Sequence, residues 1–166
     1  MTPKALVARD LMTPDVVTVS AETPIRDYVG LIRLKGFSGL PVVDGDGKVV
    51  GMVSHSDVLR GLVAFLASGA PAPGDHTTRR RVGSRLVDHL AAIEGTSVRM
   101  SEYLALPVRA VMSEEVTSCA ADSPLAAVCE AMAHKRVHRI VVVDDKDRPI
   151  GIVSAMDVVG RIGKSG

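Results

Sequence analysis

Two segments of the chain repeat one arrangement of residues that could do chemistry. Residues 51–58 read GMVSHSDV and residues 151–158 read GIVSAMDV. Each segment ends an apolar run and places a Ser three residues before an Asp, at the point where a strand would give way to a helix. The two pairs are Ser54 with Asp57, and Ser154 with Asp157. A hydroxyl and a carboxylate at this spacing have two uses.

The first use is a helix cap. The Ser hydroxyl would accept a hydrogen bond from the N–H of the Asp, and the carboxylate would accept one from the N–H of the Ser. An Asp in the first turn also interacts favourably with the helix dipole. This capping box needs no ligand.

The second use is ligand binding. A strand-to-helix junction offers unpaired N–H groups and a positive potential. An ionised Asp there can accept hydrogen bonds from two neighbouring hydroxyls, such as the 2′ and 3′ hydroxyls of a ribose. The Ser hydroxyl can reach a ribose or phosphate oxygen. The spacing alone favours the cap and leaves the ligand role open.

The repetition extends well beyond these segments. Shifting the sequence by 100 residues aligns it without an insertion, and VVDGDGKVVGMVSHSDV (42–58) falls on VVDDKDRPIGIVSAMDV (142–158). Arg9, Met12 and Pro24 fall on the same residue types in the second copy. A period this long indicates a duplicated module rather than a solenoid of short repeats.

Each copy predicts the order β-α-β-β-α. In the first copy, Thr23 is predicted as the N-cap of a helix and Pro24 as its first residue. The DGDGK turn then predicts a hairpin, and Ser54 begins a second helix. The strands are predicted at 16–19, 40–43 and 49–53, and in the second copy at 116–119, 140–143 and 149–153.

This order of elements predicts the fold class α/β (α+β). A single copy would leave one face of its sheet open. Two units related by a pseudo-twofold would pack through their sheets, with clefts between them. The predicted boundaries are 1–62 for the first unit, 63–105 for an insert and 106–166 for the second unit. In the insert we expect a flexible loop at 68–78 and an amphipathic helix at 83–94. Its basic cluster favours a solvated face over a phosphate or partner site; the cluster comprises Arg79, Arg80, Arg81 and Arg85.

Composition excludes several classes of function. The chain has 166 residues, a net charge of +1 and 2% aromatic residues, so neither electrostatic steering of a nucleic acid nor a base-stacking surface is expected. The longest apolar run is too short to span a membrane. Cys119 and Cys129 lack metal-ligand spacing and are expected as reduced thiols in the cytoplasm. No nucleophile elbow or phosphate-binding loop is present, so an enzyme is the least favoured class.

The motifs together resemble a tandem pair of CBS domains, the cystathionine-β-synthase-type or Bateman module. The resemblance rests on VVTVSAETPI (16–25), GLPVVDGDGKVVGMVSHSDVL (39–59) and HRIVVVDDKDRPIGIVSAMDVV (138–159). It covers both copies and leaves the insert outside. It implies two clefts that bind adenosyl ligands, namely AMP, ADP, ATP or in some members S-adenosylmethionine.

The resemblance also implies roles for particular residues. The Asp of each motif would hold the ribose, the Ser would lie near ribose or phosphate, and a hydroxyl on the first strand would line the pocket. Backbone at the middle strand would meet the adenine edge. The implied residues are Thr18, Val42, Ser54 and Asp57 in the first copy, and Ser118, Val142, Ser154 and Asp157 in the second.

The copies differ where phosphate would lie. The second copy has His138 and Arg139, which the resemblance places near phosphate, whereas the first has Ser38 and Gly39. Because the forked donors of Arg suit phosphate, the second site is expected to hold it better.

The function predicted is a stand-alone regulatory module, not an enzyme, that senses an adenine nucleotide. It would act on an unknown protein target in trans and form a homodimer through apolar residues, with Leu11, Met12, Val111 and Met112 near one candidate face. The alternative is a structural, dimerising scaffold in which the Ser-x-x-Asp motifs are caps only.

Overall fold

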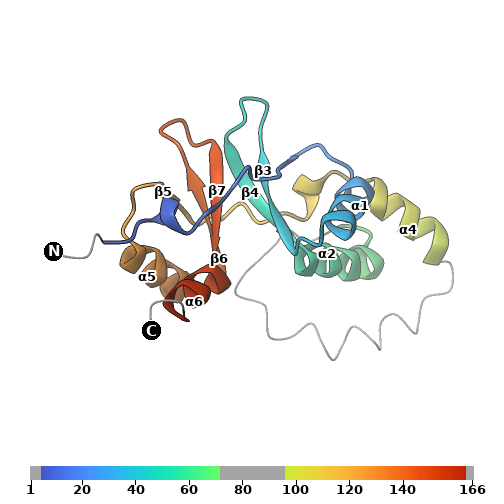
Figure 1. Ribbon diagram of the computed structural model, residues 1–166. Coiled ribbons are helices and arrows are strands. Elements are labelled where there is room, and N and C mark those ends of the chain that lie inside the picture. Colours follow the sequence, from blue (N-terminus) through green and yellow to red (C-terminus); the bar gives the residue numbers. More distant parts are fainter. Residues whose placement is uncertain (1–4, 72–95, 164–166) are drawn as a thin grey trace. The chain divides into compact units, whose positions relative to one another are not determined.

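The computed structural model describes residues 5–71 and 96–163 (Figure 1). The chain forms two compact α/β units, each with its own sheet, so the predicted fold class is confirmed. One unit, here the Ser54 unit, comprises 18–44 and 50–115. The other, the Ser154 unit, comprises 1–17, 45–49 and 116–166.

The Ser54 unit contains a three-stranded sheet of order β2-β3-β4, in which β2 runs parallel to β3. Two helices of the first repeat, helix α4 and the short helix η3 at the start of the second repeat complete it. The elements are β2 (Val19–Ser20), α1 (Ile25–Lys35), β3 (Gly39–Val43), β4 (Val49–Ser54), α2 (His55–Ser68), α4 (Thr96–Ala105) and η3 (Val108–Ala110).

The Ser154 unit contains a four-stranded sheet of order β1-β7-β6-β5. Strand β5 is parallel to β6, and β7 is antiparallel to both β6 and β1. The elements are η1 (Ala8–Asp10), β1 (Thr13–Pro14), β5 (Ser118–Ala120), α5 (Leu125–Lys135), β6 (Arg139–Val143), β7 (Pro149–Ser154) and α6 (Ala155–Gly163).

The segment that leads into each repeat packs in the unit of the other repeat. The N–H of Ala8 donates to the carbonyl of Ser123, at 2.9 Å, in the Ser154 unit. The N–H of Val108 donates to the carbonyl of Thr23, at 2.8 Å, in the Ser54 unit. Each compact unit therefore contains segments of both repeats, whereas the predicted boundaries 1–62 and 106–166 follow the sequence repeat.

The leading segments are thus exchanged between the two repeats, and this exchange corrects the predicted helix starts. The N-caps of α1 and α5 are Pro24 and Pro124, not the preceding Thr23 and Ser123, and neither cap makes a side-chain hydrogen bond. The first N–H of each helix is paired by the other repeat, because Ile25 donates to the carbonyl of Leu106 and Leu125 to that of Leu6. A backbone carbonyl thus takes the place of the expected hydroxyl.

The exchange also explains the repeated glycine of GMVS and GIVS. A Cβ at Gly51 would lie 2.9 Å from the carbonyl oxygen of Ser113, and one at Gly151 would overlap the side chain of Met12. Each glycine therefore lets a leading segment lie against the hairpin.

The candidate dimer face is corrected by the same contacts. Val111 is fully buried and Met112 is 7% exposed, while Leu11 and Met12 pack on the hydrophobic core of the Ser154 unit. Val111 and Met112 therefore belong to the interior of their unit, whereas Leu11 and Met12 are only partly buried.

The Ser154 unit has an aliphatic core of Ala8, Val128, Met132, Ile140, Val142, Val153 and Val158. The Ser54 unit departs from this pattern, because Tyr28 and Tyr103 are fully buried within it. Their hydroxyls donate to the carbonyls of Val53 and Val58, respectively. These bonds satisfy polar atoms that burial would otherwise leave unpaired.

Helix α4 was not expected from the sequence. It packs on α1 and α2, and Arg99 donates to the carbonyls of Phe65 and Leu66 at the end of α2. The predicted helix at 83–94 and the arginines at 79–81 and 85 lie outside the described residues, as does most of the predicted loop. In the described ranges, no helix combines the length and apolar character needed to cross a membrane.

Candidate functional site

The Ser54 cap joins the end of β4 to the start of α2. The backbone N–H and the hydroxyl of Ser54 both donate to Oδ2 of Asp57, at 2.8 and 2.5 Å. The N–H of Asp57 donates back to the Ser54 hydroxyl at 3.4 Å. Both halves of the predicted capping box are therefore formed.

The Ser154 cap has the same geometry at the start of α6. The N–H and hydroxyl of Ser154 donate to Oδ2 of Asp157 at 2.7 and 2.6 Å, and the N–H of Asp157 donates back at 3.3 Å. The capping prediction is confirmed here as well. In both caps the backbone and hydroxyl use only one oxygen of the carboxylate.

The second carboxylate oxygen distinguishes the two caps. Oδ1 of Asp57 accepts a hydrogen bond from a terminal nitrogen of Arg60 at 3.3 Å, and Asp57 is only 3% exposed. Asp157 is half-buried. Its hydrogen bonds to other described residues all involve Oδ2 or its own N–H, so Oδ1 remains available.

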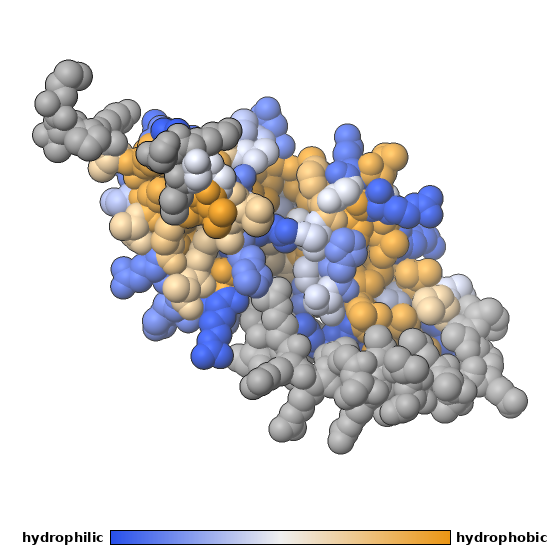
Figure 2. Space-filling model, turned by 60° about the horizontal axis from the view of Figure 1, so that its bottom comes forward, coloured by the Kyte–Doolittle hydropathy of each residue, from blue (hydrophilic) through white to orange (hydrophobic). Residues whose placement is uncertain are grey.

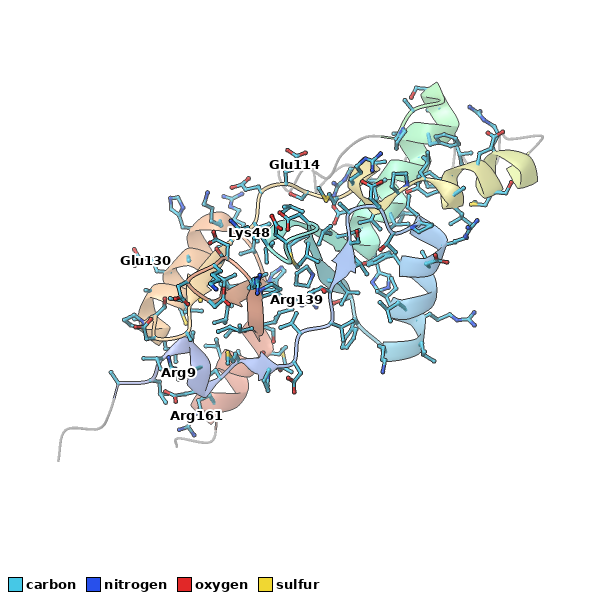
Figure 3. The ribbon with its side chains drawn as sticks, turned by 90° about the horizontal axis from the view of Figure 1, so that it is seen from above. Arg9, Lys48, Glu114, Glu130, Arg139 and Arg161 are labelled. Atoms are coloured by element: carbon cyan, nitrogen blue, oxygen red, sulfur yellow. The ribbon has the colours of Figure 1, made fainter. Side chains whose placement is uncertain are left out.

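In the Ser154 sheet, several of the predicted second-copy residues lie at the same end of neighbouring strands, which we call the Ser154 edge. Arg139 is the cross-strand partner of Ser154, and Ser118 is the partner of Val141 on the next strand. Side chains of directly opposed residues share a face of the sheet. Arg139 is the first residue of β6, and Figure 3 labels its side chain.

The remaining second-copy residues lie beside this edge. The carbonyl of His138 accepts the N–H of Ala155 at 2.9 Å, which holds exposed His138 against the start of α6. Val142 is fully buried and pairs with Cys119. Its side chain belongs to the core, so only its backbone could meet a ligand.

The first-copy residues occupy corresponding places in their own sheet. Val42 pairs with Val19, and half-buried Thr18 immediately precedes that strand. Gly39 lies against Ser54, and a Cβ on it would come within 2.9 Å of the carbonyl oxygen of Val53. The first copy therefore has no room for the counterpart of Arg139.

The cysteine of this region is not an activated nucleophile. Burial raises the pKa of the Cys119 thiol, with a hydrogen bond involving Ser123 acting weakly in the opposite direction. The thiol is thus protonated near neutral pH. Across residues 5–71 and 96–163, no group of three His, Cys, Asp or Glu side chains could hold a metal ion.

Sequence reasoning missed the role of Arg60. The alignment of the two copies places Arg60 on Gly160 and Gly39 on Arg139, so at these two aligned positions the arginine is exchanged between the copies. That difference was the available signal, but a helical arginine three residues after an Asp is indistinguishable in sequence from a surface residue.

The family model that describes the CBS domain matches the chain twice, at residues 8–64 and 108–164. Two similar solved structures are the CBS domain pair of protein MJ0100 in complex with 5′-methylthioadenosine and S-adenosyl-L-methionine, and CBSX2 in complex with AMP. The first is 18% identical, with a TM-score of 0.66 over 98% of this chain and 99% of that one. The second is 22% identical, with a TM-score of 0.66 over 95% and 96%.

A relative in sequence is inosine-5′-monophosphate dehydrogenase of Methanocaldococcus jannaschii, which is 27% identical over 154 residues. The match covers 93% of this chain but only 23% of the length of the dehydrogenase. Two ungapped repeats, one Ser-x-x-Asp cap per repeat and two α/β units agree with the paired matches of the family model. The chain therefore belongs to the CBS domain family, and it carries two CBS domains in tandem.

Proposed function

We propose that this chain is a regulatory module, not an enzyme, that binds an adenosyl ligand at a Ser-x-x-Asp cap. The observation that carries the proposal is the Asp157 carboxylate. Its Oδ2 is fixed by two hydrogen bonds from Ser154, while its Oδ1 remains available on a half-buried side chain. A fixed, partly exposed carboxylate can accept hydrogen bonds from a pair of ribose hydroxyls. Such bonds are strong, because hydrogen bonds to an ionised acceptor are stronger than those between neutral groups.

The solved relatives support the chemical class of the ligand. The MJ0100 domain pair is described in complex with 5′-methylthioadenosine and S-adenosyl-L-methionine, and CBSX2 in complex with AMP. An adenosine group is common to all three ligands. We propose AMP, ADP or ATP as the ligand here, with S-adenosylmethionine as the further candidate.

Each residue at the Ser154 edge has a proposed contact. Asp157 holds the ribose, Ser154 and Ser118 contact ribose or phosphate oxygens, and the backbone at Val142 meets the adenine. His138 and Arg139 face the phosphate, because Arg139 is opposite Ser154 in the sheet. In the first copy, Thr18, Val42, Ser54 and Asp57 occupy the corresponding places.

Regulation would follow from a shift between conformations, which requires that the ligand bind one of them more tightly. The regulated protein is proposed to be supplied in trans, and the module to be a homodimer in the cytoplasm. Hydrophobic side chains at the surface support self-association (Figure 2). On α6, Met156 is 74% and Val159 60% exposed; on α1, Leu34 is 80% exposed.

A thermal-stability panel tests the proposed function. A ligand present at about 100 times its dissociation constant stabilises the folded state by about 2.7 kcal/mol. For a chain of this size the melting temperature should rise by about 5–10 °C. The panel consists of AMP, ADP, ATP and S-adenosylmethionine, with inosine monophosphate as the control for the adenine base.

The scaffold remains the second candidate, because both capping boxes are complete without a ligand. An unchanged melting temperature with every adenosyl compound would reject the sensor and favour the scaffold. Turnover of the nucleotide would instead indicate an enzyme.

Arg139→Ala is expected to weaken binding of AMP while leaving binding of adenosine nearly unchanged. The guanidinium would contact phosphate, so its loss should cost about 1.5–3 kcal/mol for the ligand that has a phosphate. Isothermal titration of both ligands into the variant and the unchanged chain measures the difference. Equal losses for AMP and adenosine would reject the phosphate role of Arg139.

A further inference from the structure

The two caps differ in which arginine accompanies them. In the Ser54 unit the arginine comes from the helix, as Arg60, and the strand position opposite the Ser is Gly39. In the Ser154 unit the strand supplies Arg139 and the helix has Gly160. The exchange changes what the carboxylate can do, because Arg60 forms an ion pair with Asp57, with 3.3 Å between nitrogen and oxygen.

Arg60 pairs with the oxygen of the Asp57 carboxylate that the cap leaves unused. Asp57 and the Arg60 side chain are 3% and 13% exposed. Oδ2 of Asp57 already accepts two hydrogen bonds from Ser54, and Oδ1 accepts the bond from Arg60. A ribose diol would have to displace the guanidinium, leaving a buried charge without its partner, which is strongly unfavourable.

Helix α4 adds to this closure. The hydroxyl of Tyr103 donates to the carbonyl of Val58, the residue that follows Asp57. A Cβ at Gly61, the residue after Arg60, would lie 2.8 Å from that hydroxyl. The first turns of α2 are therefore covered by α4.

The Asp157 carboxylate differs from that of Asp57 both in the hydrogen bonds to its Oδ1 and in its exposure. A Cβ added at Gly160 would meet no atom within 4 Å, so the second repeat lacks a side chain at the position of Arg60 and has room to begin one. Oδ1 of Asp157 accepts no bond from the described residues. Among the described residues, the Ser154 unit therefore leaves Oδ1 of Asp157 without a donor and has no side chain at the position of Arg60.

We propose, on the basis of the proposed function, that each chain binds one adenosyl ligand, at Asp157, and that Arg60 occupies the equivalent carboxylate of the first repeat as an internal substitute for the ligand. Position 60/160 thus determines which repeat is open. A guanidinium at this position closes the site, and a glycine opens it.

The experiment is isothermal titration of AMP into the full chain and into variants at the two aligned positions. The unchanged chain should bind one AMP per chain. Arg60→Ala should add a second binding event that is lost again in Arg60→Ala combined with Asp57→Ala. Gly160→Arg should weaken binding at least tenfold, because its guanidinium can reach Asp157 three residues earlier, as Arg60 reaches Asp57.

Matched controls separate closure from other effects. Gly160→Ala adds a methyl group where no atom lies within 4 Å and should leave affinity unchanged. Circular dichroism spectra and urea unfolding confirm that each variant is folded.

The outcomes distinguish this inference from the proposed function. Binding of two AMP molecules by the unchanged chain overturns single-site binding, and a stoichiometry that stays at one in Arg60→Ala overturns the role of Arg60. An unaltered affinity in Gly160→Arg overturns the closing action of a guanidinium. If neither the unchanged chain nor any variant binds an adenosyl compound, the proposed function itself fails.

Discussion

Asp157→Ala is expected to bind AMP about 10- to 150-fold more weakly than the unchanged chain. The variant loses charge-assisted hydrogen bonds to the ribose. Hydrogen bonds to a charged group contribute about 1.5–3 kcal/mol, which corresponds to the stated loss of affinity. Loss of the cap should also lower the free energy of unfolding by about 1 kcal/mol. Titration calorimetry gives the affinity, and urea unfolding gives the stability.

Asp57→Ala is the matched control for that measurement, because Asp57 has the same cap and is closed by Arg60. We expect its affinity for AMP to equal that of the unchanged chain under conditions in which the variant is folded. Should Asp157→Ala retain full affinity, the assignment of the ribose to this carboxylate is wrong.

The same Asp57→Ala change should have the largest effect on stability, lowering the free energy of unfolding by about 3–5 kcal/mol. The reason is that Arg60 would keep a buried charge with no carboxylate beside it. Its Nε is already buried without a hydrogen-bond partner among the described residues. Unfolding in urea, followed by circular dichroism, compares this loss with that of Asp157→Ala.

The double variant Asp57→Ala with Arg60→Ala tests the cause of that loss. Removing both partners leaves no buried charge, so part of the stability should return relative to Asp57→Ala. Were the double variant no more stable than Asp57→Ala, the burial of an unpaired Arg60 would not be the reason for the loss. Asp57→Asn, which keeps most of the side-chain volume, provides a further comparison.

Local pattern was sufficient to predict much of this fold. The two Ser-x-x-Asp caps form as expected, because a capping box depends only on residues three apart in sequence. The hairpins follow from apolar runs around DGDGK and DDKDR. At those turns Gly47 and Asp147 both adopt positive φ angles, so the weaker turn chemistry of the second copy still gives the same conformation.

The features that sequence did not predict depend on contacts between distant residues. The two leading segments are so alike that pattern cannot indicate which repeat each will join, and the exchange is seen only in long-range contacts such as the bonds of Ala8 and Val108. Tyr103 shows why α4 was missed, since the helix is stabilised by packing on α2 rather than by its own periodicity. Arg60 is similar, because its burial depends on what covers α2.

The exchanged leading segments have a consequence for how the protein is made. When the first repeat leaves the ribosome, residues 5–14 belong to a unit whose strands β5, β6 and β7 have not been synthesised, and α1 lacks the carbonyl of Leu106 that will pair its first N–H. The nascent chain cannot finish one half before starting the next, in contrast to the usual N-terminal-first order of multidomain proteins. Translation must pass Ala110 before the Ser54 unit can close, and must pass α6 before the Ser154 unit can.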